Sequence, residues 1–334
     1  MSFRKKLAIL FFVLLWVAAC EQNRNAGIER LVSEQALTPG STLEEIAGSS
    51  PEIALILKTV SNPFFAQVEQ GAREAERELG VQVQVQAVAS ETAVEQQIAL
   101  VDEAIQDQVD AIVIAPMSAT ELVPPLARAQ QAGILVINID DRLDPARSRE
   151  EGLLAVPYVG VDNEQGAYLA AKHLADQVAQ PTQAVILEGA PEASNAQART
   201  AGALRAFQEN PNIQLVARET AHWKLDEAHQ VIAGLYEMHP ELGAIFAAND
   251  MMALGVLKYL EEQGRSGVLV AGYDALDEAV EAVRQGKLLV TVDQQAPRQG
   301  YLGVEYAWRG LNGEELPPET LIEVRLVTAE NVDR

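Results

Sequence analysis

The chain has 334 residues, and its 48 acidic against 25 basic residues give a formal net charge of −23 at pH 7. This acidity argues against nucleic acid as a partner and against broad adhesion to anionic lipid, because both are negatively charged. The chain holds one cysteine, which excludes an internal disulfide, so disulfides do not hold this fold together.

The first twenty residues have the composition of an export signal. Three basic residues at positions 4–6 precede an apolar stretch at 7–17 that is too short for a stable membrane span. The segment Val17-Ala18-Ala19-Cys20 resembles a bacterial lipobox, whose cysteine is lipidated after cleavage. We therefore expect residues 1–19 to be a signal peptide and Cys20 to anchor an exported protein, in the periplasm or on the cell surface. An ordinary signal peptide that ends near a cysteine is the alternative.

Residues 20–50 lack sustained periodicity and end in small polar residues, which is typical of a flexible tether behind a lipid anchor. About 280 residues follow, enough for two lobes of ordinary domain size. No later apolar run approaches the length of a membrane span, so we expect a soluble body that meets the membrane through its lipid only. Removal of residues 1–19 takes away three basic residues and leaves a charge of −26, which we interpret as a solvated surface.

From residue 52 onward, short apolar runs alternate with helical patterns. The clearest helix begins at Asn62-Pro63 and ends at Gly80. The expected strands span residues 53–57, 81–85, 111–114, 134–139, 184–187, 213–216, 244–247, 268–271 and 288–292. This alternation predicts an α/β fold with parallel sheets, and nine strands fit two sheets better than one. A polar break at 140–151 interrupts the rhythm, and residues 158–161 are expected to bridge the two lobes.

The first strand and the helix after it carry the most informative residues. The strand ends in a cation, Lys58, and the helix opens with two adjacent rings, Phe64 and Phe65. Phe64 continues the apolar stripe of the helix, whereas Phe65 falls off it, so the core does not obviously claim Phe65. Open α/β sheets bind ligands outside the carboxyl ends of their strands, which is where these residues are expected.

Further polar side chains follow other strands. They are Asp140, Asp141, Asn249, Asp274 and Gln294. Each one alone fits a turn or a helix cap, but together with Lys58 they converge on one edge of the fold. Carboxylates accept hydrogen bonds from hydroxyls, lysine and arginine donate them, and amides do both. The set therefore predicts a site for a small, hydroxyl-rich ligand, a monosaccharide or a polyol, with Phe64, Phe65 and Trp223 as rings that cover its C–H surface.

These segments resemble the type I periplasmic sugar-binding proteins of ABC transporters, in the ribose- and allose-binding branch. The resemblance covers residues 52–330, with motifs at 57–65, 114–118, 139–141, 198–202, 248–255, 272–274 and Gln294. LacI-type repressors share this body, but here an export signal replaces their DNA-binding module. By this resemblance, the family's sugar-contact positions are Asn62, Phe64, Phe65, Asp140, Arg199, Trp223, Asn249, Asp274 and Gln294.

The resemblance implies two Rossmann-like lobes joined by a hinge with three crossings, near residues 160–162, 293–295 and 321–323. Lobe 1 would comprise residues 51–160 plus 295–321, and lobe 2 residues 161–294 plus 322–334. Ligand bound between the lobes would stabilise a closed form through contacts that are better in that form. The implied partners are a monosaccharide and an ABC permease, and the protein is expected to be a monomer.

Five positions bear on the identity of the sugar. Lys58 stands where allose-type members carry a lysine and ribose-type members a serine. Asp141 matches an acidic residue of the allose type, where ribose-type members place an arginine. Both are therefore predicted ligand contacts, and they favour an allose-like hexose or a relative. Ala193 replaces a polar contact of the allose type, which argues against allose itself, and whether Arg142 or Asn195 reaches the site stays open.

An enzyme is the alternative class, because Asp140, Asp141 and Asp274 could be imagined as the acid and base of a glycosidase. The binding interpretation explains these carboxylates together with Arg199 and Gln294, which hydrolysis would not require. The common catalytic and nucleotide-binding motifs are missing, and the four histidines show no metal-ligand spacing. We therefore predict no catalytic residue, cofactor or metal site. Within binding, presentation of a polyol or furanosyl signal to a membrane sensor or chemoreceptor is the alternative to delivery to a permease.

Overall fold

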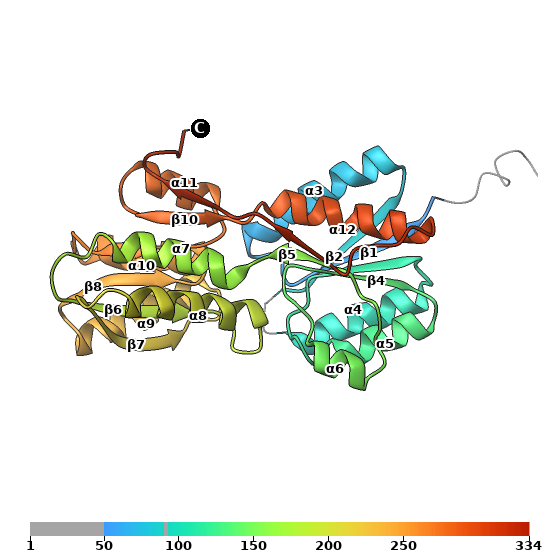
Figure 1. Ribbon diagram of the computed structural model, residues 1–334, viewed down its shortest axis with the longest axis horizontal. Coiled ribbons are helices and arrows are strands. Elements are labelled where there is room, and N and C mark those ends of the chain that lie inside the picture. The colour runs from blue at the N-terminus through green and yellow to red at the C-terminus, as the bar shows by residue number, and fades with distance from the viewer. Residues whose placement is uncertain (1–49, 90–92, 334) are drawn as a thin grey trace, which may run out of the picture. The chain divides into compact units, whose positions relative to one another are not determined.

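The computed structural model describes residues 50–89 and 93–333 (Figure 1). The predicted signal peptide, Cys20 and almost all of the predicted tether lie outside the described residues. The body contains two six-stranded sheets with helices packed against them. The predicted α/β fold with two lobes is therefore confirmed, and we call the lobes first and second in the order in which the chain enters their sheets.

The sheet of the first lobe is parallel throughout, in the order β11-β5-β4-β3-β1-β2. Its strands are β1 (Glu52–Leu57), β2 (Gln82–Ala87), β3 (Ala111–Ile114), β4 (Leu135–Ile139), β5 (Tyr158–Val161) and β11 (Glu319–Ile322). Strands β1, β3 and β4 are buried nearly throughout, which explains why they read in the sequence as continuous apolar runs.

Helices cover both faces of this sheet, because successive strand residues point to opposite sides. On one face, α3 (Pro63–Leu79) and α12 (Ala296–Leu311) pack against a cluster that includes Ile53 and Leu55. On the other, α4 (Val94–Gln106) and α5 (Val123–Gln131) pack against Ala54 and Ile56. The short helix α6 (Pro145–Glu150) lies beside α5 (Figure 1).

The second lobe has the sheet order β12-β10-β9-β8-β6-β7, in which only the pairing of β12 with β10 is antiparallel. Its strands are β6 (Thr182–Glu188), β7 (Ile213–Thr220), β8 (Leu242–Ala247), β9 (Leu269–Ala271), β10 (Val290–Asp293) and β12 (Arg325–Thr328). Its helices are α7 (Asn163–Ala175), α8 (Ser194–Gln208), α9 (Leu225–Met238), α10 (Asp250–Glu262) and α11 (Asp277–Arg284). Helix α7 packs against α8, and α9 against α10.

Local signals determine both ends of α3, the helix that carries the two predicted rings. The side-chain oxygen of Asn62 accepts a hydrogen bond from the backbone N–H of Phe64 at 3.0 Å, and Pro63 occupies the first turn. At the other end, Gly80 adopts the left-handed φ of 68° that stops a helix. The predicted start and stop of this helix are thus confirmed, and the start places Phe64 and Phe65 directly after β1.

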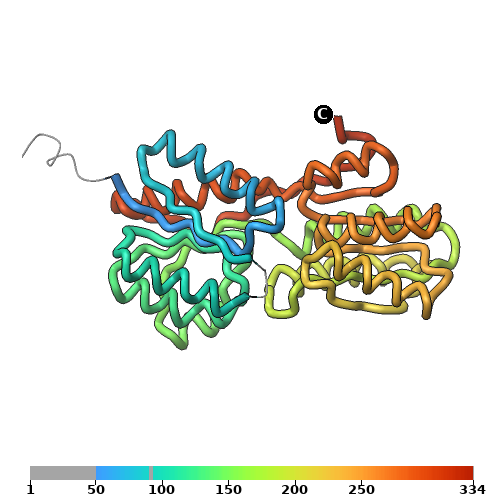
Figure 2. The backbone as a smooth tube through the Cα atoms, turned by 180° about the vertical axis from the view of Figure 1, so that it is seen from behind, coloured from blue at the N-terminus to red at the C-terminus, as the bar shows by residue number. Residues whose placement is uncertain are grey.

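The chain passes between the two sheets three times, after β5, between β10 and α12, and between β11 and β12 (Figure 2). The last two passes are bonded to each other, since the side-chain amide of Gln295 donates to the carbonyl of Glu323 at 2.6 Å. Gln295 has a left-handed φ of 53° at the start of α12, a conformation that a non-glycine residue adopts at some cost. The exact boundaries of the lobes stay a prediction.

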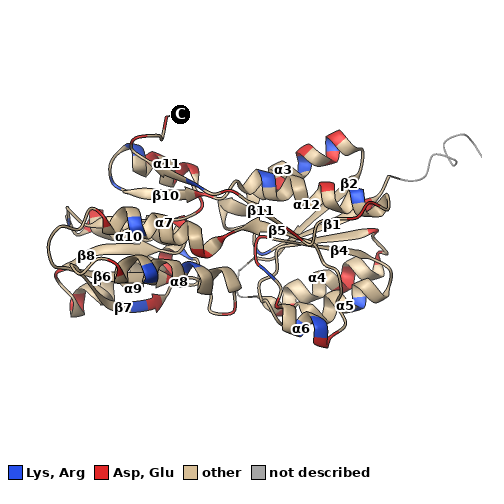
Figure 3. Cartoon of the chain, viewed as in Figure 1, with Lys and Arg blue, Asp and Glu red and all other residues tan. Residues whose placement is uncertain are grey.

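Each of the nine expected strands overlaps an observed one. The expectation that residues 158–161 bridge the lobes is wrong, because they form β5 within the first sheet and the chain crosses after them. Three further elements were not expected, namely α6, β11 and β12. Helix α6 lies inside the predicted polar break, and the two strands are short and partly exposed, so they lack an apolar run. Most of the charged residues lie on helices and loops of both lobes (Figure 3). Within residues 50–89 and 93–333, none of the helices has the length and apolar character that a membrane span needs.

Candidate functional site

A cavity of at most about 250 Å³ lies at the carboxyl ends of both sheets. Residues that follow β1 and β4 line it from the first lobe, and residues that follow β6, β7, β8, β9 and β10 line it from the second. The lining residues are Lys58, Asn62, Phe64, Phe65, Asp140, Asn195, Arg199, Trp223, Asn249, Asp274 and Gln294. Ten of the eleven predicted ligand-contact residues are thus brought together around one cavity.

Buried charge is concentrated at this edge of the two sheets. Among the described residues, the buried charged side chains are Lys58, Asp140, Asp141, Arg199, Asp250 and Asp274. Four of these six line the cavity, and the other two adjoin them in sequence or in space. Burial of a charge is costly unless it is paired, so each of these groups is expected to have a specific partner.

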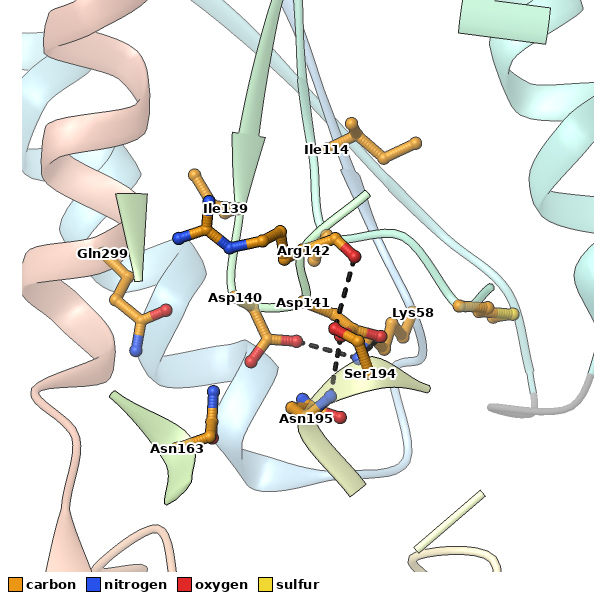
Figure 4. A network of polar contacts seen from close by, with 12 residues as sticks. Lys58, Ile114, Ile139, Asp140, Asp141, Arg142, Asn163, Ser194, Asn195 and Gln299 are labelled. Atoms are coloured by element: carbon orange, nitrogen blue, oxygen red, sulfur yellow. Dashed lines mark hydrogen bonds and ion pairs between the residues drawn. The ribbon is translucent and has the colours of Figure 1, made fainter. Parts of the chain in front are cut away.

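In the first lobe the partners are a lysine and two successive aspartates. The ammonium of Lys58 lies 2.9 Å from Oδ2 of Asp140 and 3.6 Å from Oδ2 of Asp141 (Figure 4). Asp140 has a left-handed φ of 61°, and the Tyr158 hydroxyl donates to its backbone carbonyl at 2.9 Å. The side chains of the successive residues Asp140 and Asp141 thus both reach the ammonium of Lys58. One positive charge is therefore shared by two carboxylates, of which only Asp140 lines the cavity.

The aromatic wall comes from the first turn of α3. The rings of Phe64 and Phe65 meet edge to face, with centroids 5.1 Å apart and planes at 81°. Both side chains are only 3 % exposed and both line the cavity. Phe64 thus belongs to the cavity wall as well as to the apolar stripe of the helix.

In the second lobe Arg199 is held from several sides. Its Nη1 donates to Oδ1 of Asp274 at 3.3 Å and to the carbonyl of Ala248 at 2.9 Å, while Nε donates to Asn163 Oδ1 at 2.8 Å. The guanidinium also lies 3.7 Å from the centroid of the Tyr273 ring. These partners fix the orientation of the planar guanidinium before any ligand arrives. The directions of its remaining N–H groups are therefore fixed as well.

Asp274 is the acceptor at the centre of this wall. Its Oδ1 also accepts from the Gln294 side-chain amide at 2.7 Å. Burial raises the pKa of Asp274 well above the ordinary value, and the nearby Arg199 opposes that shift. Behind it, burial raises the pKa of Asp250 to about 6, although Thr291 and the backbone N–H of Leu276 donate to its carboxylate. Asp250 does not line the cavity, and it bonds to Thr291 and Leu276 instead.

Trp223 covers the remaining side, in a turn with unusual backbone geometry. Both His222 and Trp223 have left-handed φ angles, 45° and 66°. The side-chain amide of Asn249 donates to the Trp223 carbonyl at 3.2 Å, while its oxygen caps α10 by accepting from Met252 N at 2.9 Å. A Cβ on Gly189 would lie 2.1 Å from the indole, so only a glycine leaves room for this ring position.

Three further residues bear on the predicted site. Asp141 does not line the cavity, and its carboxylate instead contacts Lys58 and the start of α8. Asn195, which the sequence left open, lines the cavity. Arg142 is turned away, with an ion pair to Glu319 and its guanidinium 4.0 Å from the Tyr158 ring. Asn195 precedes Arg199 by four residues on one helix, and this spacing could have placed both on the same face.

The two cavity carboxylates are paired within their own lobes. Asp140 binds Lys58, and Asp274 binds Arg199. The described part of the chain holds no group of three or more histidine, cysteine or acidic side chains suited to a metal ion. Two hinged α/β lobes with a polar and aromatic cavity between them define a class of ligand-binding proteins that close around a small molecule.

Comparison with known proteins identifies the family. The chain belongs to the periplasmic binding protein domain family, which it matches over residues 53–315. It is 34% identical to the D-ribose/D-allose-binding protein of Pseudomonas aeruginosa, over 90% of this chain and 95% of that protein. It is 32% identical to the D-allose-binding periplasmic protein of Escherichia coli, over 86% of this chain and 94% of that protein.

Solved structures agree with this assignment. A solute-binding protein of an ABC transporter from Actinobacillus succinogenes, solved with bound D-allose, superposes with a TM-score of 0.81 at 38% identity. The match covers 85% of this chain and 99% of that one. The predicted resemblance to periplasmic sugar-binding proteins is therefore confirmed at the level of family and fold.

Proposed function

We propose that this chain is an extracytoplasmic sugar-binding protein that closes around a monosaccharide and delivers it to an ABC permease. The observation that carries the proposal is the concentration of buried charge at one edge. Lys58 with Asp140, and Arg199 with Asp274, face one cavity from opposite lobes. Each pair offers both donors and acceptors, which is what a ring bearing several hydroxyls requires.

The chemistry of the cavity supports an allose-like hexose or a relative as the ligand. The cavity encloses at most about 250 Å³, so the ligand has to be small. Phe64, Phe65 and Trp223 supply apolar faces for ring C–H groups, and Asn62, Asn249 and Gln294 supply amides. One of the relatives described above is named for D-allose and the other for both D-ribose and D-allose, so these two sugars are the first to be compared.

Closure and export complete the proposal. Lobe 1 would comprise residues 51–160 plus 295–321, and lobe 2 residues 161–294 plus 322–334, so that a ligand contacting both favours the closed form. Residues 1–19 would direct export, and lipidation of Cys20 would hold a monomeric body at the membrane through residues 20–50. A permease, in this proposal, recognises the closed protein and receives the sugar.

A thermal-shift screen of monosaccharides and polyols tests the proposal. A molecule that binds only the folded protein raises the unfolding temperature in proportion to the logarithm of its concentration. We expect D-allose or a related hexose to give the largest shift, and D-ribose a smaller one. If no sugar or polyol of the panel shifts the unfolding transition, the proposal of sugar binding is overturned.

Two other functions are tested by related experiments. A preference for a polyol or a furanose would favour presentation of the ligand to a membrane sensor or chemoreceptor. Catalysis is tested by incubation with radiolabelled sugars and separation of the products. We expect reversible retention of unchanged sugar, because both cavity carboxylates are engaged with cations; a new product would favour an enzyme.

A further inference from the structure

Asp141 joins the two lobes, although it lies directly after a residue of the cavity wall. Its side chain has no exposed surface. Its Oδ1 accepts a hydrogen bond from the hydroxyl of Ser194 at 2.5 Å and from the backbone N–H of Asn195 at 3.0 Å (Figure 4). Ser194 and Asn195 are the first two residues of α8 in the second lobe, whereas Asp141 follows β4 in the first.

The N-terminus of α8 lacks a cap from its own lobe. Ala193 occupies the capping position, where it has no side-chain oxygen and makes no side-chain capping bond. The first N–H groups of any helix need acceptors from outside it, and a carboxylate is favoured there by the helix dipole. Asp141 provides that acceptor across the cleft, so the cap exists only while the two lobes are together.

The same carboxylate also touches the cation of the cavity wall. Oδ2 of Asp141 lies 3.6 Å from the Lys58 ammonium, which is 2.9 Å from Asp140. The two oxygens of Asp141 therefore connect α8 of one lobe with Lys58 of the other. An open cleft would break the contacts of Oδ1 and leave those within the first lobe in place.

The contact between Asp141 and α8 also holds a residue of the cavity wall, Asn195. Its backbone N–H is bonded to Asp141, while its side chain lines the cavity with only 5 % of the residue exposed. The side-chain oxygen is buried and has no hydrogen-bond partner within residues 50–89 and 93–333. A buried acceptor without a partner is costly, and a ligand hydroxyl in the cavity could donate to it.

We infer that Asp141 is a positioning residue. On closure it caps α8 across the cleft, and it thereby fixes the positions of Lys58 and Asn195 beside the ligand. This inference rests on the proposed function and deepens it, since it assigns the stabilisation of the closed form to a residue outside the cavity wall. The ligand it implies carries a hydroxyl that donates to Asn195 at the corner beside Lys58. Loss of Asp141 should therefore shorten the lifetime of the closed state, and this effect on the dissociation rate should exceed the effect on the association rate.

The test combines interlobe distances with binding kinetics. Spin labels on Leu154→Cys in the first lobe and Met238→Cys in the second, both at exposed positions, report closure in a Cys20→Ser background. Stopped-flow tryptophan fluorescence, to which Trp223 at the cavity contributes, gives association and dissociation rates with D-allose as the probe. Asp141→Ala removes the acceptor, Asp141→Asn keeps one oxygen but removes the charge, and Asp144→Ala is the matched control. Asp144 caps α6 within a single lobe, through Arg147 N.

We expect Asp141→Ala to lengthen the interlobe distance and to raise the dissociation rate roughly tenfold, with the association rate changed less than about twofold. Asp141→Asn should lie between Asp141→Ala and the parent protein, and Asp144→Ala should match the parent. Equal distances in Asp141→Ala and the parent, with and without D-allose, would overturn the inference, as would an equal effect of Asp144→Ala. The distances with bound sugar decide the inference, since the contacts of Asp141 with α8 form only on closure. Failure of the parent to bind any sugar of the panel would instead overturn the proposed function, on which the inference rests.

Discussion

The ammonium of Lys58 lies 2.9 Å from the carboxylate of Asp140, and both side chains are almost fully buried. They come from different strands of one sheet and meet at its carboxyl edge, where the turn after β4 gives Asp140 a left-handed φ of 61°. An ion pair buried in this way is weak support for stability, since desolvation offsets much of the attraction. Its position in a cavity wall instead points to recognition of a polar ligand.

Replacement of Lys58 by methionine should weaken sugar binding by tenfold or more. The change leaves Asp140 and Asp141 close together without their shared cation, and buried carboxylates without a counter-charge are costly. Calorimetry with D-allose measures the loss, at about 1.4 kcal/mol for each factor of ten. The matched control is Lys287→Met, which removes an exposed lysine paired with Glu261. Equal affinities in the two variants would contradict the role of Lys58.

The pair of Arg199 and Asp274 should behave as a unit. Arg199→Ala and Asp274→Ala should each weaken binding roughly tenfold or more, and the double variant should lose less than the two single losses combined. The reason is that each single change leaves the other charge buried. Arg205→Ala on the same helix removes an exposed arginine and serves as the control. Strictly additive losses in calorimetry would argue against a coupled pair.

Gly189→Ala should disturb the cavity through Trp223. The added Cβ would lie 2.1 Å from the indole, so the ring has to move from the cavity wall. We expect weaker binding of D-allose and an altered tryptophan emission spectrum. Gly234→Ala in α9 meets no atom within 4 Å and should leave both unchanged. Unaltered emission and affinity in Gly189→Ala would show that the indole position does not matter.

Asp250 should make stability depend on pH. Burial raises its pKa to about 6, above the ordinary value of 3.8, so the folded protein binds this proton more readily than the unfolded chain. The contribution of Asp250 to the free energy of unfolding therefore falls as pH rises from about 4 to about 6, and is constant above that. Burial shifts the pKa of Asp274 in the same direction.

Asp250→Asn should accordingly reduce the slope of stability against pH between 4 and 7. Urea unfolding at several pH values measures it, with Asp293→Asn as the control because Asp293 is less deeply buried. A slope in Asp250→Asn as steep as in the parent protein would contradict the assigned pKa. The absolute stability of the variant is a separate matter, since an amide also changes the bonds to Thr291 and Leu276.

Cys20→Ser should release the protein from the membrane fraction. The prediction follows from the lipobox-like segment before Cys20, which lies outside the described residues, and from a charge that opposes adhesion to anionic lipid. Fractionation of cells that express each form, followed by immunoblotting, measures the distribution. Continued membrane retention of the variant would refute lipid anchoring through this residue.

Much of the fold could be predicted because its signals are local. Asn62, Pro63 and Gly80 mark the ends of α3 in the sequence, and buried parallel strands read as apolar runs. The strands β11 and β12 gave no such signal, because each depends on a partner strand for its position. Strand β12 pairs with β10, and β11 pairs with β5.

The site could be predicted to a similar extent and for a related reason. Polar residues after strands of parallel sheets share one edge, so Lys58, Asp140 and Asp274 could be grouped without coordinates. Asp141 could not be placed, because its bonds to Ser194 and Asn195 span more than fifty residues and join the two lobes. A contact that forms between lobes has no periodicity or spacing in the sequence.

A calorimetric titration of the purified protein with D-allose, compared with D-ribose, tests the central claim most directly. The account predicts saturable binding of one sugar per chain, tighter for D-allose than for D-ribose, and recovery of unchanged sugar afterwards. Absence of saturable binding of either sugar, together with no shift in the wider panel, would contradict the assignment of this cavity to a monosaccharide.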